Sequence, residues 1–231
     1  MPLIYVAGKL VQFAHVARCA GSAVEDYLVA RFGPIGFLDP SHLSIPPAER
    51  WSNSSPQHVP AEAFNRLIPS SWIAHRFAIA RHPEDRLVSV FRFQRDIEQT
   101  IDPDAVFEDW VARLPEQRQK FPHTLDNHIR PATDLVPEAA TVFQLEDGLD
   151  AVVRWLDRIE GAVRLPREIL PKNGYELWAS RALGPPVVVT PAARRLITEL
   201  YDVDFRRFGY IPYDDEQIAA FPETPSCQLS D

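Results

Sequence analysis

The chain of 231 residues contains few cysteines and no long apolar run. Its two cysteines, Cys19 and Cys227, are too few for a framework of disulfides. No segment approaches the ~18 uninterrupted apolar residues of a membrane-spanning helix, and no signal-peptide cleavage pattern follows the N-terminal apolar run. The sequence therefore predicts a soluble protein without a membrane span, and the cytoplasm is the expected compartment.

Lysine is the scarcest charged residue: only Lys9, Lys120 and Lys172 occur, against 21 arginines among the 24 basic residues. The 32 acidic residues give a formal net charge of −8, so a broad basic face for nucleic acid is not expected. Two interpretations of the arginine excess are open. It can reflect the codon preference of a GC-rich genome, or some arginines can bind phosphate or sulfate, because a planar guanidinium suits such oxyanions.

Pattern and composition predict one domain over residues 1–231, with a frayed tail from about residue 224. Strand patterns alternate with helical patterns along the chain. Expected strands cover residues 10–17, 77–80 and 141–145, and expected helices cover residues 22–31, 61–68, 84–99, 103–114, 149–159 and 191–208. A long ordered loop is expected over residues 34–59. The alternation favours an α/β fold with a central, mostly parallel sheet flanked by helices.

The strand–turn–helix unit of residues 10–31 is the first candidate site. Its turn contains Arg18 and Gly21, and Ser22 and Glu25 have the spacing of a capping box. A helix N-terminus presents N–H groups and a partial positive charge to phosphate or sulfate, although capped helices also follow strands where no ligand binds. The G-x-x-x-x-G-K-S/T loop of nucleotide kinases is absent, so a kinase is not expected.

The second candidate site begins at Arg81, which follows the expected strand over residues 77–80. The carboxyl ends of parallel strands form the edge of a sheet where ligands bind. Ser89 lies about two turns along the next helix, on a face that the helix start can share. The alternative is that Arg86 forms a surface ion pair and that Ser89 is a small core residue.

Together, these segments resemble sulfotransferases that use adenosine 3′-phosphate 5′-phosphosulfate (PAPS), in particular the carbohydrate 2-O-type enzymes and their small bacterial relatives. Residues 13–22, FAHVARCAGS, are similar to the 5′-phosphosulfate loop of the family, F-I-H-I-P-K-T-A-G-T. Residues 77–91, FAIARHPEDRLVSVF, are similar to its 3′-phosphate motif, F-x-F-V-R-N-P-x-D-R-L-V-S-x-Y. Further similarities follow in family order, so the resemblance extends from about residue 10 to 210.

The resemblance implies a P-loop-like three-layer fold. It also implies in-line transfer of a sulfuryl group from PAPS to a hydroxyl of a carbohydrate or other small acceptor, with PAP as product. The 5′-phosphosulfate would be held by Arg18, Cys19, Ala20, Gly21, Ser22 and Ala23, and the 3′-phosphate by Arg81 and Ser89. Arg18 stands where the family has a lysine that offsets charge on the leaving phosphate. No metal is expected, since the reaction scheme requires none and no Cys/His ligand spacing occurs.

A general base that works near neutral pH favours histidine. Of the seven histidines, His58 is the first choice, because the resemblance implies an acceptor-side histidine between the two donor motifs, and His128 is the second. Arg18, Ala23 and Ala132 depart from the family pattern. These departures leave open a catalytically silent protein of the same fold that binds PAPS or PAP. A homodimer is compatible with the sequence.

Overall fold

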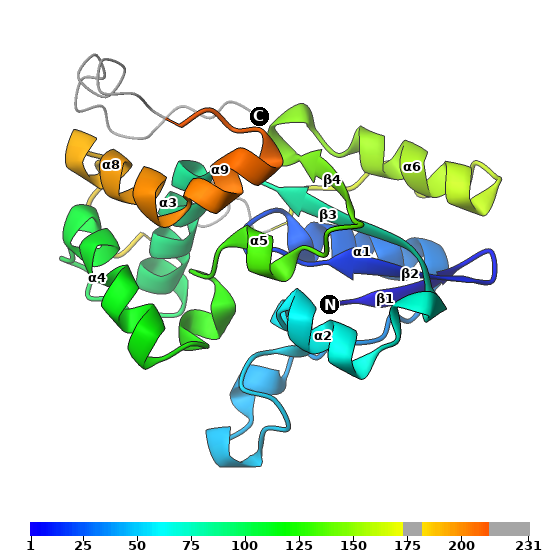
Figure 1. Cartoon of the computed structure of the whole chain (residues 1–231), viewed down its shortest axis with the longest axis horizontal. Helices are drawn as coiled ribbons and strands as arrows, with labels where there is room; N and C mark the ends of the chain where they lie inside the picture. The colour runs from blue at the N-terminus through cyan, green and yellow to red at the C-terminus, as the bar shows by residue number, and fades with distance from the viewer. Residues whose placement is uncertain (173–181, 213–231) are drawn as a thin grey trace. The chain divides into compact units, whose positions relative to one another are not determined.

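The computed structural model describes residues 1–172 and 182–212 (Figure 1). These residues belong to two compact units. The first unit comprises residues 1–81 and the described residues from 126 to 172. The second comprises residues 82–125 and the described residues from 182 to 212. Cys227 and the expected frayed tail lie outside the described residues. The expectation of one domain over residues 1–231 stays a prediction.

The first unit is built on a four-stranded sheet in the order β1-β2-β3-β4. The strands are β1 (Leu3–Val6), β2 (Lys9–Ala14), β3 (Ile73–Ala80) and β4 (Thr141–Gln144). β1 pairs antiparallel with β2, whereas β2, β3 and β4 run parallel, with Phe13 opposite Phe77 and Phe77 opposite Thr141. The prediction of an α/β fold with a mostly parallel central sheet is therefore confirmed.

β1 was not expected from the sequence, and β2 is shorter than expected. The turn between β1 and β2 has positive φ at both Ala7 (48°) and Gly8 (76°), as in a two-residue hairpin turn that matches strand twist. Alanine at the first of these positions is not a typical hairpin signal, which explains why the turn escaped prediction. β2 ends at Ala14, and buried residues 15–17 continue into the loop that follows.

The α-helices in the described part of the first unit are α1 (Gly21–Phe32), α2 (Ala61–Leu67), α5 (Ala132–Leu135) and α6 (Asp150–Glu160). Figure 1 shows α1 behind the sheet and α2 and α5 in front of it. Arg31 at the end of α1 joins α6 through Asp157 and Glu160, with N–O distances of 2.6 and 2.8 Å. Between α1 and α2 runs the expected long loop, which contains three short 3₁₀ helices.

The described part of the second unit is helical, with α3 (Pro83–Arg92), α4 (Phe107–Lys120), α8 (Pro191–Leu200) and α9 (Asp202–Phe208). α3 continues as a π-helical turn over Phe93–Ile97. Thr190 is the N-cap of α8, since its Oγ1 accepts the Ala193 N–H at 3.1 Å. The expected single helix to residue 208 is wrong. It breaks at Tyr201, whose backbone (φ −121°, ψ 21°) leaves the helical region between α8 and α9.

Buried ion pairs join these helices. The Arg86 guanidinium on α3 lies 3.7 Å from Asp204 on α9, and Arg194 on α8 lies 3.1 Å from Glu84. Arg86 is only 1% exposed, so the alternative of a surface ion pair is wrong. In the described part of the chain, no helix combines the length and hydrophobicity that crossing a bilayer requires.

Candidate active site

The loop between β2 and α1 has the backbone geometry of an anion-binding turn. Arg18 and Ala20 have left-handed φ values of 65° and 58°, with Cys19 between them. Alternation of left- and right-handed residues turns successive N–H groups toward one side, and such concave turns bind phosphate. α1 starts directly afterwards at Gly21, so the partial positive charge of its N-terminus adds to the same place.

The expected capping box of Ser22 and Glu25 is wrong. The N-cap residue is Ala20, and no side chain of the described residues caps this helix. Glu25 turns to His15 instead, with 2.6 Å between its Oε1 and the imidazole Nδ1, and both side chains are buried. A buried carboxylate needs a hydrogen-bond donor, and His15 supplies one. The N–H groups of the first turn of α1 are therefore left for a ligand or water.

The position of the His15 ring leaves no room for a side chain at residue 21. A Cβ atom added at Gly21 would lie 1.7 Å from the His15 Nε2, far inside any van der Waals contact. A glycine in a loop that binds a ligand lets the backbone approach that ligand closely. The structure adds a second reason, because the imidazole packs against the start of α1.

Arg81 contacts the loop at Arg18. Arg81 follows the end of β3, and its Nη1 lies 3.5 Å from the carbonyl oxygen of Arg18. Burial and then the charge of Arg81 lower the pKa of Arg18 to about 10, so the guanidinium remains protonated at neutral pH. Two partly buried positive charges of this kind repel one another, and a bound anion would offset that repulsion.

Three histidine rings form a cluster in the first unit. The centroids of His15 and His58 are 4.6 Å apart, and those of His58 and His128 are 5.0 Å apart. Burial is the main cause that lowers the pKa of both His15 and His128, so these two imidazoles are neutral at pH 7. The charge of Arg18 contributes to the lowered pKa of His128, which places the histidine cluster within electrostatic reach of the loop arginine.

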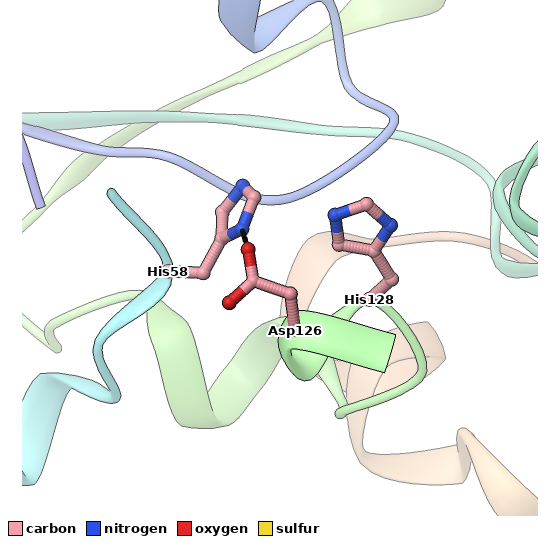
Figure 2. Close-up of side chains that lie close together, drawn as sticks. All are labelled: His58, Asp126 and His128. Atoms are coloured by element: carbon pink, nitrogen blue, oxygen red, sulfur yellow. Dashed lines mark hydrogen bonds and ion pairs between the residues drawn. The ribbon is translucent and has the colours of Figure 1, made fainter. Parts of the chain in front are cut away.

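His58 also contacts a carboxylate that sequence reasoning missed. Its Nδ1 lies 2.7 Å from Asp126 Oδ2 (Figure 2). Asp126 also accepts hydrogen bonds of 2.6 Å from both the hydroxyl and the N–H of Ser55. Burial alone would raise the pKa of Asp126, but the bonds from His58 and Ser55 outweigh it and hold the pKa well below its usual value. Only the closeness of Asp126 in the sequence to His128, the second candidate base, could have indicated it.

The same residues offer ligand atoms for a cation. One atom each from His58, Asp126 and His128 lies within 4.8 Å of the others, so the set could hold a metal ion. The sequence spacing contains no metal-ligand motif, and the side chains come together only through the fold. Two features disfavour a cation here: the Asp126 oxygens already accept three hydrogen bonds, and Arg18 adds positive charge near His128.

The remaining predicted binding residues are placed as follows. Cys19 and Ala23 are buried in the loop and at the start of α1, whereas Ala20 and Ser22 are partly exposed. Ser89 is partly exposed on α3, in the second unit. The first unit therefore contains Arg18, Arg81, His58 and His128. Ser89 belongs to the second unit.

A model of the sulfotransferase family matches residues 8–211. The chain belongs to the sulfotransferase family. The match includes both segments that resemble the donor-binding motifs, and the mostly parallel α/β architecture is consistent with a P-loop-like fold for this family. Comparisons with curated proteins and with solved structures each found no significant match. Sulfuryl transfer is the general chemistry of sulfotransferases.

Proposed function

We propose that this sulfotransferase moves a sulfuryl group from PAPS to a hydroxyl of a carbohydrate or other small acceptor. Residues 18–23 hold the 5′-phosphosulfate, and Arg81 and Ser89 bind the 3′-phosphate. The observation that carries the proposal is the contact of Arg81 with the carbonyl oxygen of Arg18 in a left-handed loop at a helix N-terminus. Such a place favours a small anion in spite of the net charge of −8.

The chemistry follows from positioning and charge. The acceptor oxygen attacks sulfur in line with the bond to the 5′-phosphate, so a new S–O bond forms as the old one breaks and PAP leaves. Arg18 offsets the negative charge that grows on the leaving phosphate. His58 accepts the proton of the acceptor hydroxyl. This scheme needs no bound metal.

His58 is a better base than His128. Burial is the main cause that lowers the pKa of His128, so its ring accepts a proton reluctantly. His58 lies between His15 and His128 and contacts Asp126, so a carboxylate is at hand when it becomes imidazolium. His58 therefore remains the first choice for the general base, and His128 the second.

Calorimetry with PAP, followed by transfer assays with labelled PAPS and a panel of hydroxyl acceptors, tests the proposal. We expect PAP to bind and kcat to fall about 100-fold or more in Arg18→Ala, while Arg18→Lys keeps most of the activity. Arg66→Ala is the matched control, since Arg66 is exposed and pairs only with Glu62 in the described structure. PAP binding without transfer to any acceptor would favour the catalytically silent alternative. Folded protein that fails to bind PAP would overturn both.

A further inference from the structure

We infer that Asp126, supported by Ser55, is a positioning residue that fixes the tautomer of His58, so that Nε2 is the atom that takes the acceptor proton. The inference rests on the proposed role of His58 as general base. Neither Asp126 nor Ser55 belongs to the donor-binding segments, and their role concerns the acceptor side of the reaction.

The hydrogen bonds decide where the proton of His58 lies. Asp126 is ionised, and a carboxylate only accepts hydrogen bonds, so the 2.7 Å contact places a proton on His58 Nδ1. Nε2 is then the basic nitrogen of the neutral ring. It is buried and has no hydrogen-bond partner among the described residues. A buried acceptor without a partner is costly in a core, whereas an acceptor hydroxyl would satisfy it.

The backbone that carries Asp126 is held in an unusual conformation. Leu125, Asp126 and Asn127 have consecutive left-handed φ values of 50°, 53° and 63°. Non-glycine residues adopt this region at a cost of about 1 kcal/mol or more each, so three in a row persist only where contacts enforce them. The enforcing contacts run to the segment of His58: Asp126 accepts from Ser55, and Asn127 Nδ2 donates to the His58 carbonyl at 2.9 Å.

The groups around His58 are consistent with a base that gains a proton during the reaction. Its ring contacts the neutral rings of His15 and His128, and Asp126 is the negative charge that touches it. An imidazolium formed at His58 would therefore be stabilised by one short, charge-assisted hydrogen bond. Ser55 restrains the carboxylate through both of its oxygens, so the carboxylate cannot turn away.

Asp126→Asn is the principal test. We expect kcat to fall about 100-fold, because an amide can donate to Nδ1 and so favour the wrong tautomer, while the KM for PAPS and the affinity for PAP stay unchanged. Asp126→Glu should restore part of the activity, and Ser55→Ala should cost about 3- to 10-fold.

Nitrogen NMR of His58, assigned with His58→Ala, reports the tautomer without turnover. We expect Nδ1 to be protonated in the wild type and the population to shift in Asp126→Asn. Asp134→Asn is the matched control, because Asp134 is an exposed aspartate of the same unit that pairs with Arg130. Wild-type kcat in Asp126→Asn, or protonated Nε2 in the wild type, would overturn the inference.

Two other results are informative. If a chelator abolishes wild-type activity and a divalent cation restores it, the cluster is a metal site and the positioning role is wrong. If the wild type binds PAP but transfers no sulfuryl group, the proposed function fails, whereas the tautomer measured by NMR still decides the Asp126–His58 arrangement independently.

Discussion

Two buried histidine–carboxylate pairs lie side by side in the first unit, and they differ in what surrounds the imidazole. His15 and Glu25 are ten residues apart, and the Nε2 edge of His15 lies against Gly21 at the start of α1. His58 and Asp126 are separated by 68 residues, and the His58 Nε2 has no hydrogen-bond partner among the described residues. The ring of the first pair is therefore packed against α1, whereas the ring nitrogen of the second pair is buried without a hydrogen-bond partner in the described part of the chain.

The difference shows that residue type alone does not identify a base. Both pairs have a similar N–O distance, 2.6 Å and 2.7 Å. The His15 pair supports the loop, since its ring also stacks on Phe13 at 5.6 Å and occupies the space that a side chain at residue 21 would need. The His58 pair contains the proposed base and the carboxylate that we infer positions it. The two pairs should therefore respond differently to equivalent substitutions.

The largest effect is expected for His58→Ala compared with His15→Ala. Loss of the base should lower kcat for sulfuryl transfer about 100- to 1000-fold. His15→Ala should keep most of the kcat per folded molecule and lose stability instead, because Glu25 is left buried without its donor. Transfer assays measure kcat and urea unfolding measures stability for both variants. Equal losses of kcat would contradict the difference in role between His58 and His15.

Gly21→Ala should break the His15–Glu25 pair through sterics. The added Cβ would lie 1.7 Å from the His15 Nε2, so we expect a loss of about 3 kcal/mol in the free energy of unfolding. The double variant with His15→Ala should recover part of this loss, since the clashing ring is absent. Urea unfolding measures both. A single variant as stable as the wild type would show that His15 moves aside freely.

Glu25→Gln is the counterpart of Asp126→Asn. The amide keeps the volume and a hydrogen bond but loses the charge, so we expect a cost of about 1–2 kcal/mol in unfolding free energy. kcat at saturating PAPS should stay within about twofold of wild type, because the folded variant still supports the loop through the hydrogen bond between residue 25 and His15. A large loss of kcat with unchanged stability would mean that the His15 pair also takes part in catalysis.

The smallest effect concerns pH. The folded-state pKa values of His15 and His128 are lowered, so the unfolded chain binds protons more readily once the pH falls below about 6.5. Their contribution to stability is fully present above that pH and is lost as the pH falls. Urea unfolding at pH 7.5 and 5.5 should show this decline, and the decline should be smaller in His15→Ala. The same decline in both proteins would exclude His15 as a cause.

Charge also distributes unevenly along the chain. Residues 1–81 and 126–173 contain 13 basic and 14 acidic side chains, whereas the rest of the sequence contains 11 and 18. The acidic excess therefore belongs mainly to the second unit. The low net charge of the unit with Arg18 and Arg81 is compatible with a local anion site, and the net charge of the whole chain conceals it.

The local sequence was sufficient to predict the elements that depend on residues only a few positions apart. The strand, turn and helix over residues 10–31, the Thr190 N-cap and the family-like segments at residues 13–22 and 77–91 could all be predicted, because period, capping and turn chemistry act over short distances. The hairpin strand β1 could not, since Ala7 is an unusual residue for its turn.

Tertiary structure alone decided which side chains meet. Glu25 had the spacing of a capping residue, yet burial beside His15 gave it a stronger partner. Asp126 reached His58 only because a left-handed turn and Ser55 hold it there. Arg18 and Arg81 came together because parallel strands bring their carboxyl ends to one edge of the sheet. The sequence by itself specified an arginine at residue 18 in a chain with few lysines. Packing between residues far apart in the chain decided that this arginine lies beside Arg81.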